Sequence, residues 1–473
     1  MQDECVIIRV IRAAAGVFAP GHLGELTQVI DFALVDAVLA ETKTLQCRVR
    51  VLPSRVVVYF VLALALFGDC SYRAVWGKLT AGLAGTGLAV ATPAVSSLCR
   101  ARRRVGAAPL RRLFETLAGP VGLPGQPGVF YRGLRTVAVD GTYLHVPAEQ
   151  AVTGRYPVRK GKREGLELGY PLLRLLALVE CGTRAVLAAA FGPDTTGELP
   201  YAGQLLGAVN ASMLVLADTA FDAADFLASI TRDRGAQFLV RSGARRCPLP
   251  QRHLPDGSYL AKIGYGVLPA LLTVRVIEAA ITITLADGIV HTEQWRLITS
   301  LTDHTRHPAT DLVNLYHQRW EIETTYYSIK ATLLDGRVLR SCSLPGIDQE
   351  AWALLTAYQA LIRAAADTAH TQPRLDMDRL SFTIILDTAR DLVTTATAIL
   401  PTSPIDLAGN IGRAALRSLQ PAWRRARTKA RSRKNSTSKY APNAGQHPTT
   451  AQPYTFHAEI TYFTEGLAAR PQR

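Results

Sequence analysis

A segment rich in proline and glycine, residues 119–128, divides this chain into two parts with different residue patterns. It holds three prolines and four glycines, which is typical of a linker. Before it, apolar residues recur at the spacing of helices. After it, β-branched and apolar runs predict strands. We therefore expect a helical N-terminal domain over residues 1–120 and an α/β fold after the linker.

The N-terminal part also contains a candidate DNA-binding surface. Pro53 should begin a strongly apolar helix. Two shorter helices, around Tyr72–Leu83 and Pro93–Arg104, resemble a helix-turn-helix arrangement. The alternative is a solvated basic face on an ordinary helical domain. The candidate DNA contacts at the end of the second short helix are Arg102, Arg103 and Arg104.

The charge of the chain favours a nucleic-acid partner. Lys and Arg number 53 against 38 Asp and Glu, a formal net charge of +15. Such a surface gains affinity for DNA by releasing counterions from phosphates. Trp423–Lys439 is strongly basic and nearly without apolar residues, so we expect a partly flexible C-terminal tail over residues 401–473. A strand at Ala458–Phe463 is the one further element expected there.

Other residue types exclude several classes of protein. The seven cysteines form no CxxC pair and the histidines show no ligand spacing, which argues against a zinc module. The longest apolar run, Val56–Phe67, is too short to cross a bilayer. We expect an intracellular protein that does not bind membranes.

After the linker, the sequence predicts a sheet. Thr136–Val146, Leu172–Val179 and Arg184–Phe191 should form an antiparallel meander, and Met213–Ala217 a short buried strand. Further β-rich segments follow between about residues 237 and 301, including Leu271–Val276 and Ala280–Leu285. Helices are expected over Thr310–Leu334, Asp348–Thr368 and Leu380–Ile399.

Two aspartates stand out at the ends of apolar runs. Asp140 follows Thr136–Val139, and Asp218 follows Met213–Ala217. An acid after such a run is costly unless it is exposed at a strand end or holds a cation. For each aspartate alone, an ordinary strand-end turn is an equally good explanation. Asp222 is better explained as the N-cap of the following helix.

A third acid is indicated by helical geometry. At about 100° per residue, four residues of the helix over 310–334 fall within about 60° of one another, beside the apolar stripe. Glu321 lies about 160° from Glu323, so Glu323 is the better ligand candidate. A solvated face with local ion pairs is the alternative. The four residues of the polar stripe are Tyr316, Arg319, Glu323 and Lys330.

Carboxylates from three segments suggest metal-dependent phosphoryl transfer. Asp140, Asp218 and Glu323 would supply hard oxygen ligands, suited to Mg²⁺ rather than zinc. Two such ions, for which Mn²⁺ could substitute, can activate a water or a 3′-hydroxyl and stabilise the leaving oxygen. Arg319 and Lys330 would neutralise the phosphate beside the scissile bond.

These motifs resemble those of DDE transposases of the insertion-sequence-four family. The resemblance rests on Asp140-Gly-Thr after a strand, on Leu-Ala-Asp218-Thr-Ala-Phe before a helix, and on Tyr316-x2-Arg319-x3-Glu323-x6-Lys330. It covers most of residues 20–400, and the helix signature is its most specific part. One departure follows Asp218, where relatives often carry an arginine and a glycine.

The resemblance implies a ribonuclease-H-like catalytic domain over residues 131–400, with a β-rich insertion at about 237–301. It further implies a cut-and-paste reaction on double-stranded DNA: cleavage at terminal inverted repeats through hairpin ends, then strand transfer into target DNA by a homodimer in a synaptic complex. Such a protein would be cytoplasmic and associated with the bacterial nucleoid. A tryptophan of the insertion stacks on a flipped base in relatives, and Trp295 is the candidate, although a core position is the more common role for such a residue.

Two other functions fit parts of the pattern. A ribonuclease-H-like nuclease would cut DNA without rejoining it, and a decayed or domesticated element would leave a non-catalytic DNA-binding protein. The presence of all three acids and both basic partners argues against decay.

Overall fold

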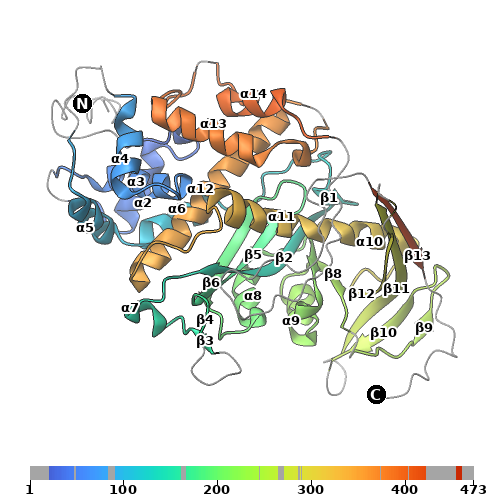
Figure 1. The fold of residues 1–473 in the computed structure, drawn as a ribbon. Coiled ribbons are helices and arrows are strands. Elements are labelled where there is room, and N and C mark those ends of the chain that lie inside the picture. Colours follow the sequence, from blue (N-terminus) through green and yellow to red (C-terminus); the bar gives the residue numbers. More distant parts are fainter. Residues whose placement is uncertain are drawn as a thin grey trace. The chain divides into compact units, whose positions relative to one another are not determined.

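The computed structural model describes residues 21–46, 50–83, 91–160, 167–243, 246–264, 271–285, 288, 290–372, 374–402, 404–421 and 454–460. The chain divides into two compact units (Figure 1). The first comprises residues 1–127, 143–173 and 324–420, and the second residues 128–142, 174–323 and 421–473.

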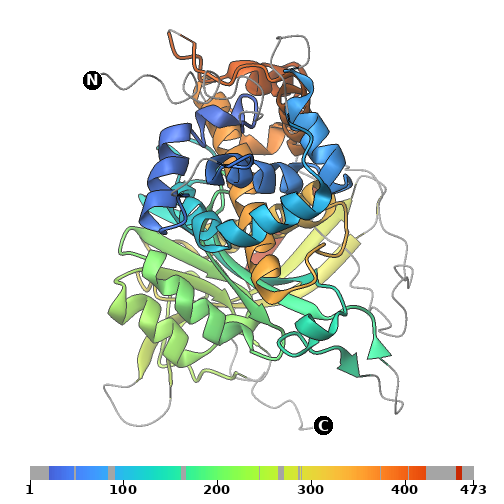
Figure 2. The same ribbon diagram turned by 90° about the vertical axis from the view of Figure 1, so that its left-hand side faces the viewer.

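The first unit is mainly helical. Pro53 is the N-cap of α3, which confirms the predicted helix start. The long helix α12 packs against α3, α6, α13 and α14, and Figure 2 shows it among them. The helix α3 is apolar and buried over almost its whole length, whereas α12 buries most of its residues but also carries charged side chains such as Glu350 and Arg363. The main helices are α2 (Phe32–Glu41), α3 (Ser54–Leu66), α4 (Tyr72–Ala81), α5 (Val95–Val105), α6 (Ala108–Leu117), α12 (Leu344–His370), α13 (Phe382–Thr395) and α14 (Gly409–Arg417).

Smaller elements complete this unit. The expected turn between the two short helices α4 and α5 includes residues 84–90, which lie outside the described residues. The remaining elements are η1 (Leu26–Gln28), α7 (Gln150–Thr153), the two-stranded ribbon β3 (Arg159–Lys160) and β4 (Glu167–Leu168), and η7 (Met377–Arg379).

The second unit is built on a mixed sheet with the strand order β6-β5-β2-β7-β8-β12-β11-β10-β9, in which β1 pairs with β2 and β13 with β11. The last residues of β2 and the first of β5 are grouped with the first unit. The strands are β1 (Phe130–Tyr131), β2 (Leu134–His145), β5 (Leu172–Glu180), β6 (Val186–Pro193), β7 (Met213–Ala217), β8 (Gln237–Arg241), β9 (Arg252–His253), β10 (Tyr259–Ile263), β11 (Leu272–Leu285), β12 (Val290–Thr299) and β13 (Tyr454–Ile460).

The first five strands of this order form a ribonuclease-H-like core. Cys181 N donates to Thr136 O and Val146 N donates to Pro171 O, so β2 and β5 run in opposite directions, as the predicted meander requires. By contrast, β2, β7 and β8 are parallel neighbours. The central position of β2 and the change to parallel pairing at β7 confirm the α/β class expected from the sequence.

The β-rich insertion continues the same sheet. The insertion was predicted to start at about residue 237, which would include β8. In the structure β8 is the fifth strand of the core, so the insertion begins after β8. The two separate segments expected around residues 271–285 form one long strand, β11. Its pairing with β12 from Arg275↔Thr299 to Thr284↔Val290 keeps the chain extended through the point where a break was expected.

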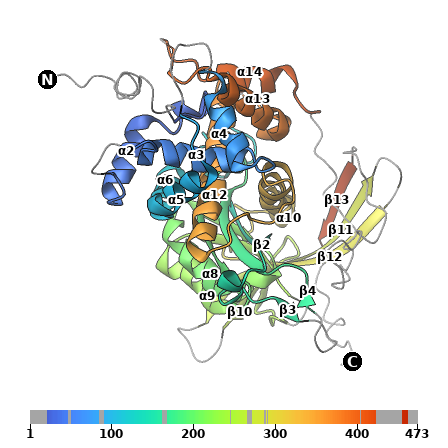
Figure 3. The same cartoon turned by 60° about the vertical axis from the view of Figure 1, so that its left-hand side comes forward.

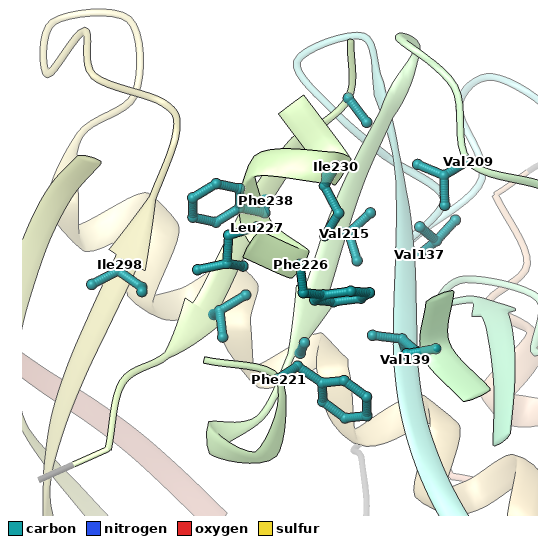
Figure 4. Close-up of a cluster of buried hydrophobic side chains, with 14 of the residues drawn as sticks. Val137, Val139, Val209, Val215, Phe221, Phe226, Leu227, Ile230, Phe238 and Ile298 are labelled. Carbon is teal, nitrogen blue, oxygen red and sulfur yellow. The ribbon is translucent and has the colours of Figure 1, made fainter. Parts of the chain in front are cut away.

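Helices cover both faces of the core sheet. On one face lie α8 (Glu198–Leu205) and α9 (Ala224–Ala228). Alternate residues of the strands, such as Val137 and Val215, form one buried cluster there with Phe226 of α9 and Ile230 (Figure 4). Because side chains alternate along a strand, the intervening residues point to the opposite face. On the second unit, α10 (Ala309–Tyr316) is tied to the end of β7 by the hydrogen bond that the Tyr316 hydroxyl donates to Ala217 O.

Part of the predicted tail has regular structure. Both α14 and β13 lie within residues 401–473, and β13 runs beside β11 in Figure 3. The basic run Trp423–Lys439 lies outside the described residues. Among the described helices, none is long and apolar enough to span a membrane.

Candidate active site

Two aspartates are neighbours where the parallel pairing of β2 with β7 ends, Asp140 inside the long strand β2 and Asp218 directly after β7. The last paired residues are Val139 and Ala217, so the next residues of the two strands are Asp140 and Asp218. Adjacent strands lie about 4.8 Å apart, which brings the two carboxylates within reach of a shared cation. The apolar residues before them supply the core on the α8 and α9 face, and alternation directs both aspartates to the other face.

Asp140 is nearly enclosed. Its side chain belongs to a residue that is 8% exposed, its Oδ1 accepts a hydrogen bond from Gly141 N at 2.7 Å, and its Oδ2 accepts one from Arg319 Nη1 at 3.2 Å. Burial raises the pKa of Asp140 to about 7; Arg319 opposes this rise, and the negative charges of Asp218 and Glu323 add to it. The four charged groups therefore act on one another, as expected for a common site.

Asp218 is half-buried and begins the short helix η3 (Thr219–Phe221), where its Oδ1 accepts a hydrogen bond from Ala220 N at 2.8 Å. Asp222 is not the N-cap that the sequence indicated, because Ala223 precedes α9. Its carboxylate instead accepts hydrogen bonds from Ser242 and Gly243 and pairs with an arginine.

The helical segment that carries the third acid is not the single α-helix predicted over residues 310–334. It consists of α10, the 3₁₀ turn η5 (His317–Trp320), α11 (Glu321–Tyr327) and the π-helical η6 (Ser328–Leu333). A 3₁₀ turn is wound more tightly than an α-helix and a π turn more loosely. The wheel angles drawn at 100° per residue therefore do not describe the whole segment.

Tyr316 ties this segment to the sheet. Its side chain is buried, not part of an open polar stripe, and its hydroxyl donates a hydrogen bond to Ala217 O at 3.0 Å. Ala217 directly precedes Asp218. The start of the 3₁₀ turn is thus held at the end of β7, beside Asp218.

The two glutamates of α11 differ in their surroundings, but not as the wheel predicted. Glu321 is the buried one and forms an ion pair with Arg184 at 3.1 Å. Glu323 is exposed, and its charge acts on Asp140 and Arg319. Burial on more than one side of the helix explains why Glu321, which lies outside the predicted apolar stripe, is enclosed. Glu323 remains the candidate ligand, now because Glu321 is already paired.

The donor set suits a hard divalent cation. Carboxylate oxygens are the ligands that Mg²⁺ prefers. The pKa of Asp140 is raised mainly by burial and further by the charges of Asp218 and Glu323, and a bound cation would offset those charges. Among the described residues, no three acidic, histidine or cysteine side chains lie close enough together to form a ready-made metal site. In this structure the guanidinium of Arg319 forms an ion pair with the Asp140 carboxylate.

Trp295 lies on β12 and contacts Tyr316. The ring centroids are 5.2 Å apart in an edge-to-face arrangement, and Trp295 Nε1 donates to Glu293 at 3.0 Å. The indole is half-buried: it is neither enclosed in the core nor fully exposed to solvent. Arg241, which sequence reasoning missed, lies 5.7 Å from the centre of this ring. Arg241 follows Val240, which pairs in register with Ala217. The sequence could have indicated this residue, because it is a basic residue at the end of the next strand after Asp218.

The other basic candidates lie in the first unit. Lys330 is half-buried in η6. Arg102 is 6% exposed and donates hydrogen bonds to Gln349, Ser341 and Gly346 O, so it is a packing residue and not the DNA contact that was predicted. Arg103 and Arg104 are exposed, although Arg104 also donates to Leu52 O at 2.6 Å. A cluster of arginines in the sequence does not show which of them are buried, as Arg102 is, and which are exposed, as Arg103 and Arg104 are.

Comparison with known families identifies the chain. The family described as "Insertion element 4 transposase N-terminal" matches residues 20–115, and the "Transposase DDE domain" matches residues 131–360. The chain belongs to the insertion-sequence-four family of DDE transposases. It is a DNA transposase, an enzyme that cleaves and joins DNA, as the sequence predicted. Enzymes with this domain use divalent metal ions.

Two relatives from Escherichia coli are also described as transposases. The chain is 28% identical over 345 residues to "Transposase InsG for insertion sequence element IS4" of Escherichia coli (strain K12), which covers 71% of this chain and 75% of that protein. It is 29% identical over 139 residues to "Putative transposase InsZ" of the same organism, covering 29% of this chain and 46% of that protein. A solved structure of the piggyBac transposase synaptic complex with hairpin DNA overlaps 82% of this chain and 84% of its own at 11% identity, with a TM-score of 0.42.

Proposed function

We propose that Asp140, Asp218 and Glu323 are the catalytic carboxylates of this transposase and bind two Mg²⁺ ions, for which Mn²⁺ can substitute. The observation that carries the proposal is the parallel register that makes Asp140 and Asp218 neighbours, together with the effect of the charge on Glu323 on the pKa of Asp140. When bound, the ions supply an activated water or 3′-hydroxyl and stabilise the leaving oxygen.

The chain's own basic groups then bind and orient the DNA phosphate. Arg319 is held beside the carboxylates by its hydrogen bond to Asp140. If a cation bound Asp140 and neutralised its charge, the guanidinium of Arg319 would be available to pair with the DNA phosphate. Lys330 and Arg241 are proposed as further phosphate contacts, and Arg103 and Arg104 as contacts of the N-terminal domain. Tyr316 positions the segment through Ala217 O.

The substrate is proposed to be the double-stranded terminal inverted repeats of the element, cut through hairpin ends and joined to target DNA by a homodimer. Trp295 would stack on a flipped base, since an indole offers an aromatic platform. Support comes from the half-exposed indole and its contact with Tyr316. In this proposal, Trp295 holds the unpaired base while the carboxylates act on the adjacent phosphate.

A cleavage assay on labelled element-end DNA with Mg²⁺ tests the proposal. Glu323→Gln should lower the rate of nicking and hairpin formation by at least about 10³-fold, because one ligand is lost while DNA binding is retained. Asp225→Asn is the matched control: this exposed acid lies on α9, on the other face of the sheet, and its change should leave cleavage unaltered. Cleavage that survives in Glu323→Gln would show that another carboxylate is the third ligand.

A further inference from the structure

The strand β11 extends beyond the neighbours that pair with its first half. Residues Leu272–Val276 pair with β10 on one edge, and residues Ala279–Leu285 pair with β13 on that same edge. On the other side of β11, β12 pairs with β8 through its last residues, Leu297–Thr299, and Ser242 N donates to Arg296 O just before them. In the described part of the chain, the outer half of the β11–β12 ribbon is therefore joined to one further strand, the C-terminal β13.

A ribbon of two strands alone is marginally stable in water, and a third strand is generally needed for independent stability. The antiparallel ladder between β11 and β13 runs without a break from Ala279↔Ile460 to Leu285↔Tyr454. The outer half of the ribbon thus depends on a segment that is distant in sequence. Loss of β13 would leave the backbone N–H and C=O groups along that edge of β11 without their strand partners.

Trp295 lies on the part of the ribbon that β13 supports. Ala279 pairs with Trp295 on β12 and with Ile460 on β13, so these three residues form one row across three strands. The strand β13 also lies against α10, whose last residue, Tyr316, packs on Trp295. The C-terminal strand therefore contacts α10, which carries Tyr316, and β11, the strand next to the one that carries Trp295.

We propose that β13 is a positioning element for transposition: by completing the outer half of the β11–β12 ribbon, it holds Trp295 against Tyr316 beside the catalytic carboxylates. The effect on the ribbon stands on the strand pairing alone. The effect on catalysis rests on the proposed function of Trp295.

Two truncations separate β13 from the residues after it. Ending the chain after Pro453 removes β13, whereas ending it after Ile460 keeps the strand and serves as the matched control. Without β13, amide hydrogen exchange in residues 279–296 should be at least about tenfold faster, while residues 213–217 in the core sheet keep their protection. Hairpin formation on element-end DNA should fall at least about tenfold at unchanged DNA affinity.

A second variant tests the pairing without shortening the chain. Successive N–H groups of a strand point to opposite sides, so His457→Pro with Ala458→Pro must remove one ladder bond to β11. It should reproduce the effects of the shorter truncation product. A peptide of residues 452–462 added to that product should restore both exchange protection and hairpin formation.

Two results would overturn the proposal. If hydrogen exchange in residues 279–296 is the same in the protein that ends after Pro453 as in the protein that ends after Ile460, β13 does not support the ribbon. If the ribbon loosens but hairpin formation stays at the control rate, β13 does not position the site. Failure of the proposed carboxylates looks different, since Glu323→Gln leaves hydrogen exchange in the ribbon unchanged whether or not it abolishes cleavage.

Discussion

At the scale of single residues, Asp140 is the group whose charge state the fold alters most clearly. Burial and two nearby carboxylates raise its pKa from 3.8 to about 7, despite the opposing effect of Arg319. The folded protein therefore binds a proton at Asp140 more tightly than the unfolded chain does. Without metal, this residue should make the free energy of unfolding fall as pH rises from about 4 to 7.

Asp140→Asn tests this sign. The amide resembles the protonated acid, so in EDTA the variant should match the parent protein at pH 4 and exceed its free energy of unfolding at pH 8, by up to about 4 kcal/mol. Urea denaturation at the two pH values measures the difference. The same variant should lack metal-dependent cleavage at every pH. Equal stability of the two proteins at pH 8 would mean that Asp140 is ionised in the folded state at little cost.

At the scale of elements, the start of α10 is fixed by a buried arginine of the insertion. Arg275 is fully buried; its guanidinium pairs with Asp256 and donates to His307 O at 2.6 Å. Asp256 Oδ2 also accepts a hydrogen bond from Ala309 N, the first residue of α10, at 3.0 Å. The insertion thereby sets where the segment with Tyr316 and Arg319 begins.

Removing that guanidinium should be costly. We expect Arg275→Met to lower the free energy of unfolding by about 3–5 kcal/mol, because carbonyl groups and a carboxylate lose a buried partner. The control is Arg413→Met, which breaks an exposed pair with Asp406 whose side chains are 46% and 41% accessible, and should cost less than about 1 kcal/mol. Chemical denaturation of both variants gives the comparison, and similar losses for the two would refute the anchoring role of Arg275.

At the scale of the whole molecule, the net charge of +15 should make DNA binding strongly dependent on salt. The run Trp423–Lys439 carries eight of the basic residues. Replacing those eight by glutamine should reduce the slope of log K against log salt by about 0.9 for each phosphate that the run neutralises. Fluorescence anisotropy with labelled element-end DNA from low to physiological salt measures both slopes. An unchanged slope would mean that other parts of the chain bind the phosphates.

The sequence by itself determined the class of the fold and the family. The apolar runs before Asp140 and Asp218 predicted buried strands, and an acid after such a run is costly unless it lies at a strand end or holds a cation. Asp218 does follow the end of β7, whereas Asp140 is buried inside β2. Periodicity predicted the meander and most helices, since local side-chain spacing reflects which face is buried. The spacing from Tyr316 to Lys330 carried the resemblance that the family comparison confirmed.

Only the tertiary structure decided which similar residues play different parts. Arg102 and Arg103 are adjacent in sequence, but one is enclosed beside Gln349 and the other faces solvent. The partner of Arg184 on α11, the anchor at Arg275 and the return of β13 to β11 likewise join residues distant in the chain. Sequence periodicity reports the average burial of a face, whereas these pairings depend on which distant side chain or strand edge meets each residue in the folded protein.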